Sequence, residues 1–183
     1  MQALFDAFVR IWQRDGWERA TTRAVALEAG VAVGTLYEYF PSKLALQSGY
    51  VRYCIEQLIL RVNEAAIEPP DLAWEDRLHR MLQRLCGVER QGMPWFHPKL
   101  LELEPSIAEH KHQQRAHEEL RQMWHRLFAA CTDLPRPVAP ATVDALHLAV
   151  WGGRRYAMLI HLDEAALASW AEQMEILCRN MLD

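Results

Sequence analysis

Residues 21–43 gather side chains whose chemistry suits contact with phosphates and with the edges of bases. The hydroxyls of Thr35, Tyr37 and Tyr39 lie close in sequence to the ammonium of Lys43. Hydroxyl and ammonium groups donate hydrogen bonds to phosphate oxygens, and a threonine methyl can contact a thymine methyl. These residues can act together only if one local structure presents them on a common face.

The pattern around these residues predicts two short helices joined by a glycine turn. Thr21 and Thr22 offer an N-cap for a helix that reaches Ala29, and Gly30 allows a left-handed turn after it. A second helix is expected from about Val33 to Phe40, where Pro41 stops it. This spacing is typical of a helix-turn-helix.

The inward and outward sides of the second helix can be separated by their spacing. Leu36 and Phe40 lie four residues apart and are expected to pack onto the first helix, where Ala26 leaves room for a close crossing. The outer side then presents Val33, Gly34, Thr35, Tyr37 and Tyr39. We expect this face to enter a groove of DNA.

The same stretch resembles the DNA-binding signature of the TetR family of transcriptional regulators. The resemblance rests on a threonine pair, an Ala-Gly-Val turn, Gly-Thr-Leu-Tyr, an aromatic pair and Ser-Lys, all within residues 21–46. It implies phosphate contacts at Thr22, Tyr37 and Lys43. It further implies that the residues nearest to base edges are Arg23, Val33, Gly34, Thr35 and Tyr39.

The charge distribution agrees only weakly with DNA binding. The chain has a net charge of −4, divided into +1 over residues 1–53 and −5 over the remainder. Many proteins of the resembled family begin with a basic arm, whereas this sequence starts Met1-Gln2-Ala3-Leu4. Either the sequence is shortened there, or its affinity for DNA depends on fewer charges.

Helical periodicity continues through the rest of the sequence, and strand signals are nearly absent. We predict an all-α protein of about nine helices, with a three-helix DNA-binding head over residues 1–45. Residues 46–183 are predicted to form a helical body for ligand binding and dimerisation. Within it, Asp71 is expected to cap a helix from Leu72, and Ser106 with Glu109 is expected to form a capping box.

Large rings and methionines in the body suggest a pocket as well as a core. Most of them are explained by core packing, but such side chains also suit an apolar ligand. The family resemblance implies a pocket between the middle helices. From the residues themselves, His97 and His125 are expected to supply polar groups near it. The best candidates for its lining are Trp95, Phe96, Met123 and Trp124.

The last two predicted helices have the pattern of a subunit interface. Gly152 and Gly153 lie inside a helix, where each glycine costs about 1 kcal/mol relative to alanine, so a close approach of another helix is expected. Packing of the same faces within one chain is the alternative. The candidate interface residues are Val150, Gly153, Ala157, Trp170, Met174 and Leu177.

Other classes of protein find little support in the sequence. No nucleophile motif, glycine-rich phosphate loop or metal-ligand set is visible, so we expect no catalytic residues, metal or cofactor. The four cysteines form no Cys-x-x-Cys pair, and neither a signal peptide nor a membrane span is apparent, which favours the cytoplasm. A small helical enzyme and a protein-binding adaptor remain as alternatives.

Together these features predict a ligand-responsive repressor of transcription. A homodimer would bind a near-palindromic operator in double-stranded DNA, and a small, largely apolar effector would release it.

Overall fold

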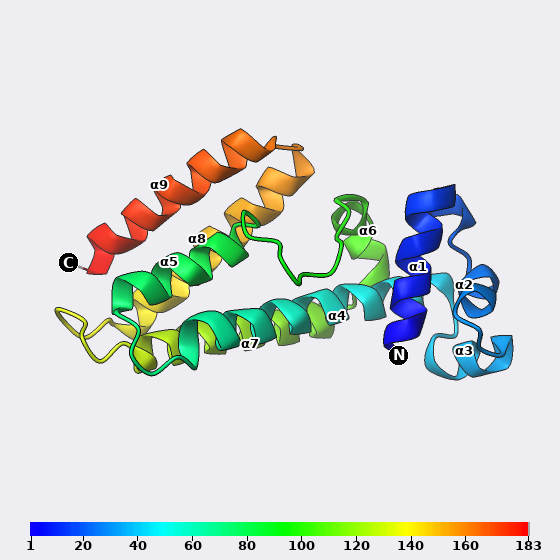
Figure 1. Cartoon of the computed structure of the whole chain (residues 1–183), viewed down its shortest axis with the longest axis horizontal. Helices are drawn as coiled ribbons and strands as arrows, with labels where there is room; N and C mark the ends of the chain where they lie inside the picture. Colours follow the sequence, from blue (N-terminus) through cyan, green and yellow to red (C-terminus); the bar gives the residue numbers. More distant parts are fainter. Residues whose placement is uncertain (183) are drawn as a thin grey trace. The chain divides into compact units, whose positions relative to one another are not determined.

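The computed structural model describes residues 1–182 and contains only helices there. This confirms the predicted all-α class and the count of nine α-helices over the described residues (Figure 1). Their bounds are α1 (Gln2–Asp15), α2 (Thr22–Glu28), α3 (Val33–Tyr39), α4 (Lys43–Val62), α5 (Trp74–Leu85), α6 (Lys99–Ile107), α7 (His110–Ala130), α8 (Pro140–Leu159) and α9 (Glu164–Leu182). Two short turns are added, a 3-10 turn at Trp17–Arg19 and a π-helical turn at Asn63–Ile67.

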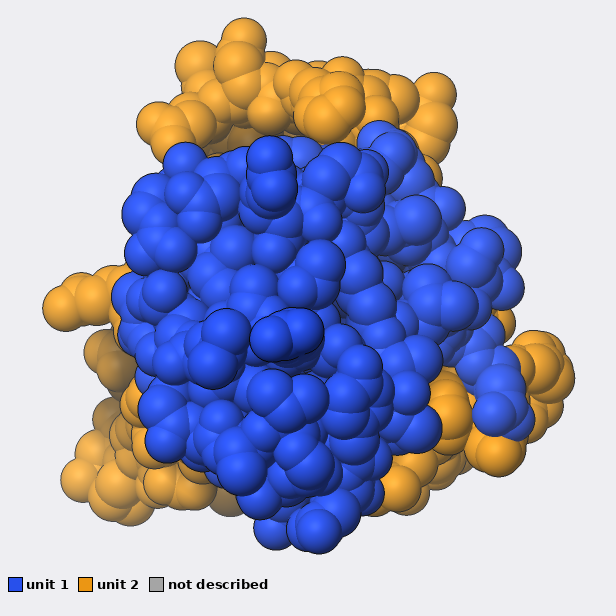
Figure 2. Space-filling model, turned by 90° about the vertical axis from the view of Figure 1, so that its right-hand side faces the viewer, with its two compact units in different colours: residues 1–53, 95–109 blue, residues 54–94, 110–183 orange. Residues whose placement is uncertain are grey.

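The chain divides into two compact units, shown in different colours in Figure 2. The first contains residues 1–53 and 95–109, and the second contains residues 54–94 and 110–183. The boundary falls inside α4, and α6 belongs to the first unit. Because these units are defined by packing, the functional division at residue 45 stays a prediction.

The first unit is built on an apolar face of α1. Leu4, Phe8 and Ile11 recur at helical spacing and are buried. Gly16 ends α1 with φ 89°, a left-handed conformation that favours glycine, and its N–H donates to the carbonyl of Trp12. The phenyl ring of Phe8 contacts Tyr50 of α4 at a centroid distance of 5.3 Å. Aromatic packing thus joins α1 to the first half of α4.

The second unit packs α5, α7, α8 and α9 around a core with Met81, Met123 and Trp124 at its centre. Arg77 of α5 is buried, and its guanidinium donates to the carbonyls of Ala66, Ile67 and Pro69. These bonds satisfy carbonyls left free where the π-helical turn ends. Arg77 therefore fixes the loop between α4 and α5.

Two predicted helix starts were wrong. The helix α5 begins at Trp74 and not at Leu72, and Trp74 N–H donates to the carboxylate of Asp133 at 3.1 Å rather than to Asp71. Ser106 lies inside α6 and not before α7, so it forms no capping box there. At α5, the helix start is capped by a residue 59 positions away, which a local pattern does not include.

Candidate DNA-binding site

The helix-turn-helix forms as predicted. Thr21 caps α2, because its hydroxyl accepts a hydrogen bond from Ala24 N–H at 3.2 Å. Gly30 then adopts φ 69°, and Val31 N–H donates to the carbonyl of Ala26 at 3.0 Å. This is the bonding of a helix that ends on a left-handed glycine, and it turns the chain into α3.

Packing of α3 onto α2 decides which side chains face outward. Val25, Ala26 and Leu36 are fully buried. With Leu36 facing inward, Tyr37 is 47% exposed and Tyr39 is 58% exposed. Both tyrosines therefore present much of their side-chain surface outside the packed side of α3.

The predicted contact residues lie in different degrees of exposure. Arg23, Gly34, Thr35, Tyr37 and Tyr39 are exposed, and Val33 is half-buried. Thr22 is buried, and its hydroxyl lies 3.1 Å from that of Tyr37. A hydroxyl pair of this kind orients the Tyr37 ring and leaves its oxygen able to form a further hydrogen bond.

Gly34 is unusual because it lies inside a helix with empty space beside it. A Cβ added there would meet no other atom of the chain within 4 Å. The internal packing of α3 therefore does not require a glycine at this position.

Lys43, the first residue of α4, is held by a residue that the sequence analysis missed. Its ammonium donates to the carbonyl of Trp17 at 2.8 Å and lies 4.4 Å from the centroid of the Trp17 ring. Burial lowers the pKa of Lys43, and the nearby carboxylate of Glu18 partly opposes that shift. An aromatic residue just after the helix-ending Gly16 was the only sequence signal for this contact.

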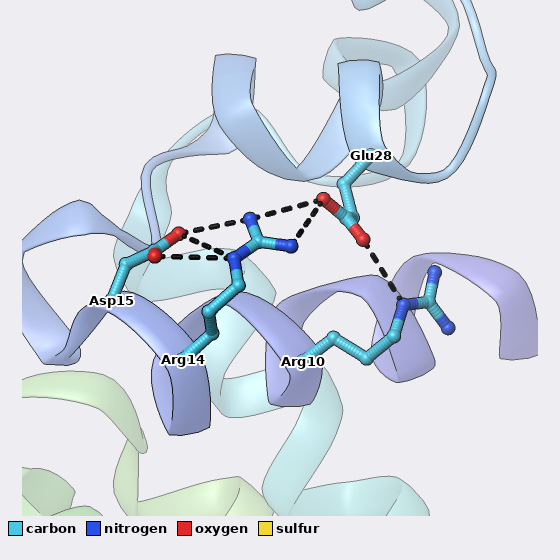
Figure 3. A network of polar contacts seen from close by, with 4 residues as sticks. All are labelled: Arg10, Arg14, Asp15 and Glu28. Carbon is cyan, nitrogen blue, oxygen red and sulfur yellow. Dashed lines mark hydrogen bonds and ion pairs between the residues drawn. The ribbon is translucent and has the colours of Figure 1, made fainter.

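Two arginines of α1 do not add free positive charge to the head. Figure 3 shows Glu28 accepting hydrogen bonds from both Arg10 and Arg14 at 3.2 Å. Arg14 also donates to Asp15, and these contacts hold the pKa values of Asp15 and Glu28 below their usual range. The local charge of this network is therefore close to neutral.

The predicted pocket residues are divided between the two units. Met123 and Trp124 are buried in the second unit, whereas Trp95 and Phe96 are half-buried in the first. Trp95 contacts the ring of Trp12 at 5.2 Å, and its carbonyl accepts a hydrogen bond from the Tyr50 hydroxyl. No single unit holds all four residues, and a shared pocket stays a prediction.

The predicted interface residues behave in two ways. Val150 and Ala157 are buried within the chain, and a Cβ on Gly153 would lie 2.6 Å from the ring of Trp170 on α9. The close approach at Gly153 is therefore made inside the chain, and Trp170 and Met174 are half-buried beside it. Leu177 is exposed, and it shares that property with Leu148, Gly152, Tyr156, Leu159, Ile160, Ile176 and Met181.

Three histidines of the second unit, His117, His125 and His147, take part in polar contacts. His147 of α8 lies 3.1 Å from His117 of α7, and His125 lies 2.9 Å from Asp144. Within residues 1–182, no three His, Cys, Asp or Glu side chains are placed to hold a metal ion together. In the same part of the chain, no helix combines the length and apolarity needed to cross a bilayer.

Comparison with known proteins finds a family match for the N-terminal part of the chain. Residues 4–47 match the model of the bacterial regulatory proteins of the tetR family. The match covers about a quarter of the chain, and the proteins of that family are regulatory proteins. The matched residues include the whole helix-turn-helix and Lys43.

The similar proteins are regulators of transcription. The HTH-type transcriptional repressor KstR of Mycolicibacterium smegmatis is 41% identical over 64 residues, which cover 35% of this chain and 31% of that protein. A TetR transcription regulator from Haloarcula marismortui has a TM-score of 0.72, 20% identity and coverage of 100% and 97% of the two chains. The transcriptional regulator FadR from Bacillus subtilis, solved with stearoyl-CoA, has a TM-score of 0.61, 16% identity and coverage of 100% and 99%. The whole chain therefore shares the fold of these two solved regulators, whereas the sequence identity with KstR is confined to about a third of either protein.

Proposed function

We propose that this protein is a homodimeric repressor whose two α3 helices bind a near-palindromic operator and whose body binds a releasing effector. The observation that supports it best is the outward face of α3, where Thr35, Tyr37 and Tyr39 are exposed beside the open backbone of Gly34. In a two-fold dimer, the two helices would enter successive major grooves about 34 to 36 Å apart. A palindromic operator follows from that symmetry.

The residues of the proposed site fall into two groups, one that contacts phosphates and one that contacts bases. Lys43 and Tyr37, with Thr22 orienting the Tyr37 hydroxyl, serve as phosphate contacts that position the head without reading sequence. Thr35, Val33, Gly34, Tyr39 and Arg23 lie nearest to the base edges. Arg23 is exposed, and a guanidinium can donate two hydrogen bonds to a guanine.

The dimer would use the exposed apolar faces of α8 and α9. Leu148, Gly152 and Tyr156 follow one another at intervals of four residues on α8, and Ile176, Leu177 and Met181 line α9. Contiguous exposed apolar side chains mark association surfaces. A second copy of the same two helices would cover them, which gives the four-helix arrangement of a two-fold interface. Of the residues predicted from sequence, Leu177 fits this surface, whereas Val150 and Ala157 support it from beneath.

The effector is proposed to be largely apolar, with one or two hydrogen-bonding groups. Met123 and Trp124 give the body a bulky, adaptable interior, and Trp95 and Phe96 are aromatic side chains that are only partly buried. FadR, which shares the fold, was solved with stearoyl-CoA, a ligand with a long apolar chain. We assign ligand binding and dimerisation to residues 46–183 and DNA binding to residues 1–45.

Release would require the effector to favour one arrangement of α4 over another. Lys43 stands at the start of α4, and the same helix continues to Val62 in the second unit. A tilt of α4 would move Lys43 and the head with it. A differential affinity of about 1 to 3 kcal/mol is enough for a roughly 5- to 150-fold loss of operator binding.

The test is binding of the purified protein to genomic fragments by fluorescence anisotropy at several salt concentrations. The proposal expects tight, salt-dependent binding of a few fragments, with Thr35→Ala changing which fragments bind. A protein-binding adaptor would show no DNA affinity, and either that result or equal affinity for every fragment would refute the proposal. Compounds that raise the melting temperature are then titrated against the bound fragment, where an effector must weaken binding because linkage is reciprocal.

A further inference from the structure

Four aromatic side chains stand in contact between Lys43 and the segment before α6. Trp17 lies 4.4 Å from Trp12 between ring centroids, with the planes at 60°. Trp12 in turn contacts Trp95 at 5.2 Å and His97 at 5.2 Å. Trp95 and His97 also contact each other at 5.6 Å. These contacts all lie within the first compact unit.

Both ends of this stack are fixed by hydrogen bonds. At one end, the Lys43 ammonium donates to the Trp17 carbonyl and lies over its ring. At the other end, the Tyr50 hydroxyl donates to the Trp95 carbonyl, and Lys99 N–H donates to His97 Nδ1 at 3.1 Å. Trp12, in the middle, is buried. Close-packed rings in a buried position cannot be displaced singly, because neighbouring rings must move with them.

We propose that the Trp95–Trp12–Trp17 stack positions the Lys43 ammonium, so that residues 95–97 control the strength of the Lys43 phosphate contact. This inference rests on the proposed role of Lys43 in DNA binding. The ammonium has three donors; one is used by the Trp17 carbonyl, while the ring holds the group in place. Trp17 is therefore a positioning residue and leaves the other donors for phosphate. Any movement of Trp95 reaches Lys43 through ring contacts as well as through α4.

The first experiment observes Lys43 without DNA. The only lysines in the sequence are Lys43, Lys99 and Lys111, so labelling with lysine carrying ¹³C at the ε position gives a simple spectrum. Lys43 should resonate upfield of the other two, because its terminal group lies over the Trp17 ring. Trp17→Leu should remove that upfield shift, and Trp95→Leu should reduce it.

Trp151→Leu is the matched control, since Trp151 is a half-buried tryptophan of the second unit. It should leave the Lys43 resonance unchanged. A Lys43 resonance that is unaffected by Trp95→Leu would overturn the proposal. If circular dichroism shows that the Trp95→Leu protein has lost its helices, a second variant is made at the exposed His97. His97→Ala should also shift the Lys43 resonance, and an unchanged resonance would again overturn the proposal.

The second experiment is a double-mutant cycle on operator affinity. Trp17→Leu should weaken binding by about 2- to 30-fold, the range of a cation–π contact, and should lower the salt dependence as Lys43→Ala does. The double variant should bind no worse than Lys43→Ala alone, because both changes remove one contact. Additive losses would overturn the proposal. If Lys43→Ala leaves DNA affinity unchanged, Lys43 does not contact a phosphate. The coupling between Trp95 and Lys43 is tested independently by the NMR experiment.

Discussion

The outer faces of α3 and of α8 with α9 differ in chemistry but share one backbone feature. The exposed face of α3 bears hydroxyls and a short threonine, whereas that of α8 and α9 bears leucine, isoleucine and methionine. Each face contains a helical glycine with no atom of the chain within 4 Å of a Cβ, Gly34 in one and Gly152 in the other. At Gly153, next in sequence to Gly152, the ring of Trp170 occupies the space that a Cβ would need. Packing within the chain therefore does not require glycine at position 34 or 152, and the side chains around the two glycines differ in chemistry.

Gly34→Leu is expected to have the largest effect on DNA binding. A leucine there would project into the space that the DNA backbone or a base edge must enter. Loss of one or two contacts of about 1 to 3 kcal/mol each would weaken operator binding by at least tenfold, and up to about a thousandfold. The melting temperature should stay the same or rise, because leucine favours a helix over glycine. If anisotropy shows the same operator affinity for Gly34→Leu and the wild type, the open side of Gly34 does not face the DNA.

The stability of the body should fall at a higher pH than the stability of the head. Burial lowers the pKa of His147 from 6.5 to about 4, with His117 and Arg121 adding to that shift and Asp144 opposing it. The neutral form is favoured in the folded state, so its contribution is complete above pH 6.5 and is lost as pH falls toward 4. The loss amounts to about 3 kcal/mol by pH 4.

The head should respond only at lower pH, because Asp15 and Glu28 have depressed pKa values and stay ionised well below neutrality. Urea unfolding at pH 7.5, 6 and 5 measures the difference. The wild type should lose stability in this window, and His147→Leu should show a flatter profile. A wild-type stability that does not change between pH 7.5 and 5 contradicts the account of His147.

Gly152→Leu and Gly153→Leu form a matched pair that separates dimerisation from folding. At Gly152 an added Cβ meets no atom of its own chain within 4 Å, so a leucine there should overfill the proposed subunit interface by about 1 to 3 kcal/mol and raise the dimer dissociation constant. At Gly153 the new side chain meets Trp170, and the melting temperature of the chain should fall by a similar free energy. Sedimentation and thermal melts distinguish the two results. A Gly152→Leu protein that dimerises like the wild type would remove α8 from the interface.

Lys43→Ala should give the smallest effect, because it removes a single phosphate contact. The slope of log affinity against log salt should fall by about 1, with little change in sequence preference. Tyr37→Phe should weaken binding to all sequences to a similar extent without altering the slope. A salt slope that is the same for Lys43→Ala and the wild type would exclude Lys43 from the phosphate contacts.

Local signals in the sequence were sufficient for the head. The Thr21 cap, the left-handed Gly30 and the inward Leu36 depend on neighbours within about ten residues, so their pattern predicted both helices and the turn. The Asp163 cap of α9 was predictable for the same reason, and its carboxylate accepts from Ala166 N–H at 2.8 Å. Such contacts join residues that are close together in the sequence, so a sequence pattern reveals them.

Contacts between distant residues could not be predicted in this way. Asp133 caps α5 from 59 positions away, and Lys43 is 26 positions from Trp17. Gly153 was assigned to the subunit interface because the sequence shows that something approaches it, but not that Trp170 of the same chain does so. Tertiary packing, rather than local propensity, decides these three positions.

The most direct test of the central claim is selection of bound duplexes from a random DNA library. The wild-type dimer should enrich a near-palindrome whose half-sites are about one helical turn apart or a multiple of it. Thr35→Ala should enrich a site altered at a few symmetric positions, since Thr35 lies on the exposed face of α3. If no palindrome is enriched, or if Thr35→Ala selects the same sequence as the wild type, α3 does not read the operator as proposed.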